Sequence, residues 1–181
     1  YDALVPTQYD LTLRVKKYKG LYGAGQICGT SGYEEAAGLG LIAGINAALY
    51  VQGKEPFTLK RNESYIGVMI DDIVTKGTLE PYRLLSSRAE YRLLLRHDNA
   101  DVRLTPYGYK LGLISKERYE KFLKKNENVE KAIEILGKIH LGSSKKVNGY
   151  LAEKGYELLK AGVSGLEFFK RPEIHYEDVC A

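Results

Sequence analysis

The sequence predicts an α+β protein, with strand-forming segments near the N-terminus and a mostly helical remainder. Over residues 1–20, apolar side chains alternate with polar ones, which is typical of a half-buried strand. The alternating apolar positions are Tyr9, Leu11, Leu13 and Val15. A second short strand is expected over residues 20–26. From residue 33 onward, small or apolar side chains recur at three- and four-residue spacing, which is typical of helices.

A glycine-rich loop over residues 22–32 leads into a helix that is expected to end near Tyr50. Glycines lack a Cβ atom, so such a loop can turn sharply and approach a ligand closely. The helix also carries glycines, although each one costs a helix about 1 kcal/mol relative to alanine. Two interpretations stay open: close packing against a sheet, or contact with another backbone or a flat cofactor. The small residues are Ala36, Gly40, Ala43, Gly44 and Ala47.

The N-terminus of this helix is a candidate binding site. Its first N–H groups have no partner within the helix, and the helix dipole places partial positive charge there. An anion or the electron-rich edge of a ring would bind favourably at this end. Because a loose glycine pattern is a weak fingerprint by itself, the loop alone does not identify the ligand.

The rest of the chain reads as a series of helices. A domain boundary is expected near residues 53–62. The next helix should cover residues 65–76, with Asn62 or Ser64 as its cap and Gly77 at its end. The alternation near residues 86–104 favours a short strand. Further helices are expected over residues 105–113 with Pro106 at the first position, from Ser115 to about Ile139, and over 144–160 and 164–170.

Composition excludes several classes of protein. The chain has 181 residues, of which 44% are hydrophobic and 28% charged, and no apolar run approaches the ~20 residues that span a bilayer. Cys28 and Cys180 are too few and too far apart for a disulfide framework, and no residues have metal-ligand spacing. These features favour a cytoplasmic protein with no membrane partner and no metal. The net charge of +4 is compatible with a nucleic-acid partner without requiring one.

A series of arginines is the second candidate site. Arg88, Arg92 and Arg96 recur every four residues, so they would share one face of a helix or of a strand. Arg83 and Arg103 flank them. Such a basic stripe would neutralise RNA phosphates. The alternative is an internal network of salt bridges with the nearby acids, which are Glu90, Asp98 and Asp101.

The sequence assigns no catalytic residue. Asp71 and Asp72 are adjacent, and adjacent residues on a helix point about 100° apart. We therefore expect that they cannot both face one site, and that their role is structural.

Three stretches resemble a known family. They are GAGQICGTSGYEEAAGLGLIAGINAA within residues 22–48, IDDIVTKGTLEPYR with SSRAEYRLLLRHDNADVRLT within residues 65–105, and RPEIHYEDV at residues 171–179. In these stretches the chain is similar to the MnmG/GidA family, the FAD-dependent enzymes of tRNA uridine 5-carboxymethylaminomethyl modification. The similarity spans nearly the whole chain and weakens between about residues 118 and 165.

The resemblance implies a domain organisation. Residues 1–55 would be the C-terminal segment of an α/β, Rossmann-like FAD-binding domain, and residues 56–181 would begin a mostly helical region. The chain contains no G-x-G-x-x-G motif, so the unit that binds the FAD pyrophosphate is expected upstream.

The resemblance also implies cofactor contacts in the glycine loop. Gln26 matches a glutamine that the family associates with FAD, and its neighbours would line the same turn. The expected cofactor-binding residues are Gly25, Gln26, Thr30, Gly32 and Tyr33. Cys28 stands where the family usually has asparagine, so a small buried thiol is expected there rather than a nucleophile.

The family's reaction implies cosubstrates and partners. Reduced FAD takes part in moving a one-carbon unit from methylenetetrahydrofolate, NADH supplies reducing equivalents, and the wobble uridine of certain tRNAs receives a carboxymethylaminomethyl group at C5. A tRNA-modification GTPase is the expected partner, and the family is homodimeric. The chain alone is expected to be inactive, because the pyrophosphate-binding glycines and the family's catalytic cysteines would lie upstream. The alternatives are a non-catalytic tRNA- or protein-docking module and another FAD enzyme, such as a folate-dependent tRNA methyltransferase.

Overall fold

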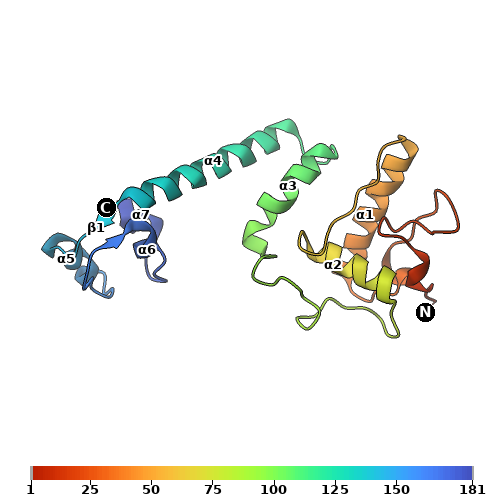
Figure 1. Cartoon of the computed structure of the whole chain (residues 1–181), viewed down its shortest axis with the longest axis horizontal. Helices are drawn as coiled ribbons and strands as arrows, with labels where there is room; N and C mark the ends of the chain where they lie inside the picture. The colour runs from red at the N-terminus through yellow and green to blue at the C-terminus, as the bar shows by residue number, and fades with distance from the viewer. Residues whose placement is uncertain (1, 181) are drawn as a thin grey trace. The chain divides into compact units, whose positions relative to one another are not determined.

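The computed structural model describes the backbone of residues 2–180 and the side chains of residues 2–178, so the side chain of Cys180 lies outside the described part. The chain divides into two compact units, Tyr1–Ser115 and Lys116–Ala181 (Figure 1). Leu39 and Ile73, which lie on either side of residue 55, belong to one apolar cluster of the first unit. The expected domain organisation, residues 1–55 and 56–181, stays a prediction.

Two helices that pack on each other organise the first unit (Figure 1). They are α1, Tyr33–Val51, and α2, Tyr65–Asp71. Ser64 rather than Asn62 caps α2, because its side chain accepts a hydrogen bond from the backbone N–H of Gly67 at 2.9 Å. The helix continues as a wider π turn over Asp72–Lys76 and stops at Gly77, as the sequence predicts. The core of the first unit contains Tyr9, Leu13, Leu39, Ile42, Met69, Ile73 and Tyr82.

The strand expected over residues 1–20 is wrong for the described residues of that range. Asp10 Oδ1 accepts a hydrogen bond from the backbone N–H of Thr12 at 2.8 Å and so turns the chain. Leu13 follows with a φ of +64°, which breaks the extended backbone. Isolated bridges stand in place of the two expected strands, between Tyr9 and Val15 and between Arg14 and Tyr22.

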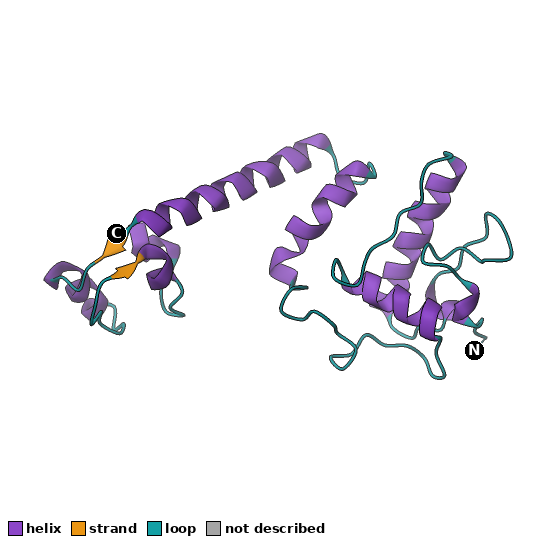
Figure 2. Cartoon of the chain, in the orientation of Figure 1, coloured by secondary structure: helices purple, strands orange, loops and turns teal. Residues whose placement is uncertain are grey.

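The strand expected near residues 86–104 is also wrong. Residues 82–96 run through irregular turns, which Figure 2 shows as a long loop before α3, Ala100–Lys110. Tyr91 has a φ of +52°, so the backbone cannot stay extended there. The alternating side chains therefore do not belong to a strand. Because α3 begins at Ala100, Pro106 lies inside the helix and not at its first position.

The second unit is built mainly from short helices around one long helix. Its elements are α4, Lys116–Lys138; β1, His140–Leu141; α5, Lys145–Glu153; β2, Val163–Ser164; α6, Gly165–Phe169; and α7, Tyr176–Cys180. The strands β1 and β2 pair antiparallel. Leu151, Leu159, Phe168 and Ile174 form its core. The long helix and the helices after Ser144 and Ser164 confirm the sequence prediction, although α5 ends before residue 160, and neither α7 nor the two strands was expected.

The described residues thus form a mixed, helix-rich structure with one small two-stranded sheet. None of its helices combines the length and the apolar character that crossing a membrane requires. Among the same residues, no group of three or more His, Cys, Asp or Glu side chains is placed to hold a metal ion.

Candidate functional site

The glycine loop is one tight turn that precedes α1. Residues Gly25–Cys28 form a single 3-10 turn. Gly25 and Gly29, with φ of +77° and +87°, occupy the left-handed region that other residues rarely adopt. The loop then reaches α1, whose N-cap residue Gly32 provides no side-chain hydrogen bond to the helix. The first N–H groups of α1 are therefore left uncapped by a side chain at Gly32.

The loop is held from outside by residue Tyr82. The backbone N–H of Tyr82 donates to the Gly29 carbonyl at 2.7 Å, and the backbone N–H of Ser31 donates to the Tyr82 carbonyl at 3.2 Å. These two bonds form a parallel bridge at Thr30. A segment about fifty residues downstream thus fixes the shape of the turn.

The structure separates the five predicted cofactor residues into two groups. Gln26 and Tyr33 are exposed, and Tyr33 is 93% accessible. Gly25 is half-buried, while Thr30 and Gly32 are buried. The Thr30 Oγ1 atom is buried and has no hydrogen-bond partner among the described residues. The side chains open to an incoming ligand are therefore those of Gln26 and Tyr33.

Cys28 is fully buried beneath the loop, as expected for a small structural thiol. Burial raises the pKa of the Cys28 thiol, so the thiolate is disfavoured. Burial, together with the neighbouring thiol, raises the pKa of Tyr9 to about 12. Neither group is prepared for nucleophilic chemistry.

Glu35 is a site residue that sequence reasoning missed. It is 7% exposed although it lies in the first turn of α1. Its Oε1 atom accepts a hydrogen bond from the backbone N–H of Leu84 at 2.9 Å and lies 3.6 Å from Arg83 Nε. A Cβ atom on Gly32 would overlap Glu35 Oε2, so the glycine makes room for the carboxylate. That Oε2 atom has no hydrogen-bond partner among the described residues.

The arginines do not form the expected stripe. With neither a helix nor a strand over residues 82–96, four-residue spacing no longer places them on one face. Three of the five pair with acids, but among these pairs only Asp98 is one of the acids that the salt-bridge alternative named. Arg88 lies 3.8 Å from Glu80 and 4.6 Å above the Tyr82 ring, and Arg96 pairs with Asp98 at 2.9 Å.

Two further arginines differ from this pattern. Arg103 donates hydrogen bonds to Asn99 Oδ1 at 2.9 Å and to the backbone carbonyls of Glu63 and Arg96. It therefore ties α3 to the loop before α2. Arg92 is exposed and makes no hydrogen bond or ion pair with the described residues. Its guanidinium is available to an external anion.

Arg61 holds three carboxylates together and was not singled out from the sequence. Its Nη1 atom contacts Asp71 at 2.8 Å and Asp72 at 2.9 Å, and its Nε atom contacts Glu90 at 2.7 Å. The expectation that Asp71 and Asp72 cannot face one site is therefore wrong. The helix widens into a π turn at this point, and one guanidinium nitrogen reaches both side chains. Their expected structural role agrees with these ion pairs.

Asp72 is the buried member of this cluster. Besides Arg61, it accepts hydrogen bonds from Lys76 Nζ at 2.7 Å and from the Tyr82 hydroxyl at 3.0 Å. Burial opposes ionisation of Asp72, but the hydrogen bonds from Lys76, Arg61 and Tyr82 outweigh it and lower its pKa. Burial, together with the Asp72 carboxylate, raises the pKa of Tyr82.

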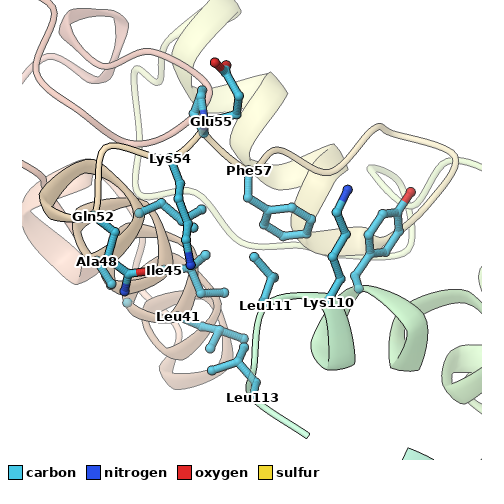
Figure 3. A pocket seen from close by; sticks show the side chains of 15 residues that line it. Leu41, Ile45, Ala48, Gln52, Lys54, Glu55, Phe57, Lys110, Leu111 and Leu113 are labelled. Atoms are coloured by element: carbon cyan, nitrogen blue, oxygen red, sulfur yellow. The ribbon is translucent and has the colours of Figure 1, made fainter.

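The glycines of α1 serve two different faces. Gly38 packs on α2, since its Cβ position lies 3.3 Å from Ile66. Gly40 and Gly44 have no neighbour there within 4 Å and line a pocket of about 570 Å³. Figure 3 shows apolar side chains around this pocket from α1, from the loop after it and from the turn after α3; they include Leu41, Ile45, Phe57, Leu111 and Leu113. Close packing thus accounts for Gly38 only.

Two protein-family models match this chain. The model described as "Glucose inhibited division protein A" matches residues 1–55, and the model of the "tRNA modifying enzyme MnmG/GidA C-terminal helical domain" matches residues 116–181. The second range coincides with the second compact unit.

Curated relatives match over almost the whole chain. A protein of Caldicellulosiruptor saccharolyticus named tRNA uridine 5-carboxymethylaminomethyl modification enzyme MnmG is 60% identical over 98% of this chain. The protein of the same name from Enterococcus faecalis is 59% identical over 99% of the chain. In both cases the chain spans 28% of the relative's length.

Solved structures give the same answer. Aquifex aeolicus GidA in its form II crystal is 40% identical, with a TM-score of 0.76 over 98% of this chain and 30% of that chain. The form I crystal gives 47% identity and a TM-score of 0.75 over 87% of this chain and 28% of that one. From the family models, the relatives and these structures together, the chain belongs to the MnmG/GidA family.

Proposed function

We propose that this chain is part of an FAD-dependent enzyme that installs a carboxymethylaminomethyl group at C5 of the wobble uridine of tRNA. The names of its relatives support this activity, and the chain spans 28% of their length. The observation that carries the cofactor assignment is the glycine loop. Its two left-handed glycines fold the backbone into a tight turn directly before the N-terminus of α1, which Gly32 leaves without a side-chain cap.

The residues of the loop fit a flavin. The exposed Gln26 amide both donates and accepts hydrogen bonds, which suits the mixed edge of an isoalloxazine ring or the ribityl chain. Tyr33 stands open at the start of α1. Gly25, Thr30 and Gly32 shape the turn, and the N-terminus of α1 would stabilise negative charge on the reduced ring. Residues 1–55 would close a Rossmann-like FAD domain.

The arginines are proposed to contact tRNA phosphates. Arg92 is the strongest candidate because it is exposed and has no partner among the described residues. Arg83, Arg88, Arg96 and Arg103 would exchange or share their present partners when RNA binds. Each phosphate contact would increase the salt dependence of the affinity.

The wider reaction belongs to the same proposal. When bound, FAD would supply the redox chemistry for moving a one-carbon unit from methylenetetrahydrofolate, with NADH as the source of reducing equivalents. A tRNA-modification GTPase, a homodimer and a cytoplasmic location complete it. The chain alone would be inactive, because the unit that binds the pyrophosphate would lie outside it.

The visible absorption spectrum of the full-length protein tests the cofactor assignment. A flavin spectrum is expected in the wild type, and a weaker or shifted one in Gln26→Ala. Gln8→Ala is the matched control, because Gln8 is also an exposed glutamine but lies outside the loop. A full-length protein that stays colourless when FAD is added would overturn the proposal. Salt-dependent tRNA binding would then favour a docking module.

A further inference from the structure

Tyr82 connects the glycine loop to residues 82–96, the irregular stretch that carries Arg83, Arg88, Arg92 and Arg96 and that we call the arginine-bearing segment. Its side chain is completely buried. Its backbone makes both bonds of the bridge to Gly29 and Ser31, while its ring lies under the Arg88 guanidinium at 4.6 Å. Its hydroxyl donates to Asp72 Oδ2 at 3.0 Å. One residue therefore contacts the loop, an arginine of the segment and a buried carboxylate.

Arg61 extends this connection in the other direction. Its guanidinium joins Asp72 to Glu90 at distances of 2.9 and 2.7 Å. Glu90 lies within the arginine-bearing segment, between Arg88 and Arg92. The two ends of residues 82–90 are thus both tied to Asp72, one directly through Tyr82 and the other through Arg61.

These contacts matter because residues 82–96 contain neither a helix nor a ladder strand. Their start is held to the glycine loop and to α1 by the bridge of Tyr82 and by the hydrogen bond from the Leu84 N–H to Glu35. Side-chain hydrogen bonds with charged partners are the strong ones, and they are geometrically specific. The hydrogen bond from the Tyr82 hydroxyl to Asp72 therefore anchors the side chain of the same residue whose backbone bridges to the glycine loop.

We propose that Tyr82 is a positioning residue that holds the glycine loop in its flavin-binding shape, and that Arg61 fixes the arginine-bearing segment to the same frame through Asp72 and Glu90. This inference rests on the proposed function for its ligand. Tyr82, which positions the glycine loop, and Arg61, which positions the arginine-bearing segment, then share one partner, the Asp72 carboxylate.

The first test is Tyr82→Phe in the full-length protein. The variant loses only the hydroxyl and keeps the ring beneath Arg88. We expect flavin binding to weaken by about threefold to tenfold, which is the loss of one net hydrogen bond, with a shift in the visible flavin spectrum. Tyr107→Phe is the matched control, since its hydroxyl donates to the Glu63 carboxylate at 2.8 Å, away from the loop. Flavin binding in Tyr107→Phe should equal wild type.

Hydrogen exchange of residues 25–33 in the flavin-free protein separates this inference from the proposed function. Faster exchange in Tyr82→Phe than in Tyr107→Phe supports the positioning role even in a protein that takes up no flavin. Equal exchange in the two variants overturns it. If the wild type binds flavin, an unchanged flavin affinity in Tyr82→Phe overturns it as well.

Glu90→Gln tests the other end. It removes the charge that Arg61 holds without touching Tyr82. We expect tRNA affinity of the full-length protein to fall by about threefold or more, while flavin affinity stays at the wild-type value. Unchanged tRNA affinity would contradict the role of Arg61 in fixing the segment.

Discussion

In each of the two compact units, one asparagine amide binds both backbone groups of a distant residue, but the two asparagines differ in burial. In the first unit, Asn46 of α1 donates to the Phe57 carbonyl at 2.8 Å and accepts from the Phe57 N–H at 2.7 Å. In the second unit, Asn148 of α5 binds both backbone groups of Leu159 in the same way, at 3.1 and 2.8 Å. Asn46 is 2% exposed, whereas Asn148 is only half-buried.

The difference shows what each unit depends on. In the first unit, buried polar side chains hold irregular backbone: Asn46 binds both backbone groups of Phe57, and Glu35 binds the Leu84 N–H. In the second unit, short helices with local serine caps surround a small apolar cluster. The first should therefore be more sensitive to the loss of buried polar contacts, and the second to the loss of apolar volume.

The largest effect is expected from Leu151→Ala. Leu151 is completely buried in the small core of the second unit, and truncating a buried leucine removes about 3 kcal/mol or more of stability. Hydrogen exchange measured peptide by peptide should become much faster over residues 145–174 and stay unchanged over α2. Uniform acceleration across both units would show that they do not unfold separately.

Asn46→Ala compared with Asn148→Ala tests these paired asparagine hydrogen bonds directly. We expect Asn46→Ala to lower the free energy of unfolding by about 3 kcal/mol, because the site of the amide is buried and both backbone groups of Phe57 lose their partner there. Asn148→Ala should lower it by about 1 kcal/mol, because water can replace the amide at this half-buried site. Denaturant unfolding followed by peptide-resolved hydrogen exchange measures each loss. Equal losses would mean that burial does not determine how much the paired asparagine hydrogen bonds contribute to stability.

Asp72→Asn should destabilise the first unit by about 2 kcal/mol at pH 7, since the acceptor of the hydrogen bonds from Arg61, Lys76 and Tyr82 loses its negative charge. The folded state lowers the Asp72 pKa, so this contribution is present above the ordinary aspartate value and is lost as the pH falls through the lowered one. The gap between wild type and variant should therefore close below about pH 4. Unfolding curves at pH 7 and in steps below pH 4 measure it, and a gap that stays constant would rule out Asp72 as its source.

The smallest effect is expected from the helix caps. Ser144 accepts from the Val147 N–H at 3.3 Å at the exposed start of α5, and Ser64 caps α2 at 2.9 Å in a buried position. Ser144→Ala should cost about 1 kcal/mol, and Ser64→Ala should cost more because the freed N–H is buried. Thermal unfolding of the two variants side by side gives the order, and the reverse order would weaken the contrast between the units.

The helices were predictable because their signals are local. Ser64 and Gly77 mark the ends of α2 and its π extension, and α1 ends one residue beyond the expected Tyr50. The strands near the N-terminus were not predictable, because the turn at Asp10 and the positive φ of Leu13 convert an alternating pattern into a folded loop. The strand predicted near residues 86–104 was wrong because Tyr91 also has a positive φ.

The candidate site divides in a similar way. The glycine loop, the buried Cys28 and the family membership all follow from residues adjacent in the sequence. Glu35 was not recognised because an acidic residue in a first helical turn normally faces water. Arg61 was not recognised because its carboxylate partners lie ten or more residues away in the sequence.

The sequence by itself determined the order of the longer helices, the ends of α2 with its π extension, and the glycine loop, because backbone propensities and capping act over a few residues. Only the tertiary structure decided that Tyr82 bridges to the loop, that Asp71 and Asp72 share Arg61, and that the arginines separate instead of forming a stripe. Those outcomes depend on which distant groups are available to satisfy buried polar atoms, and no short stretch of sequence contains that information.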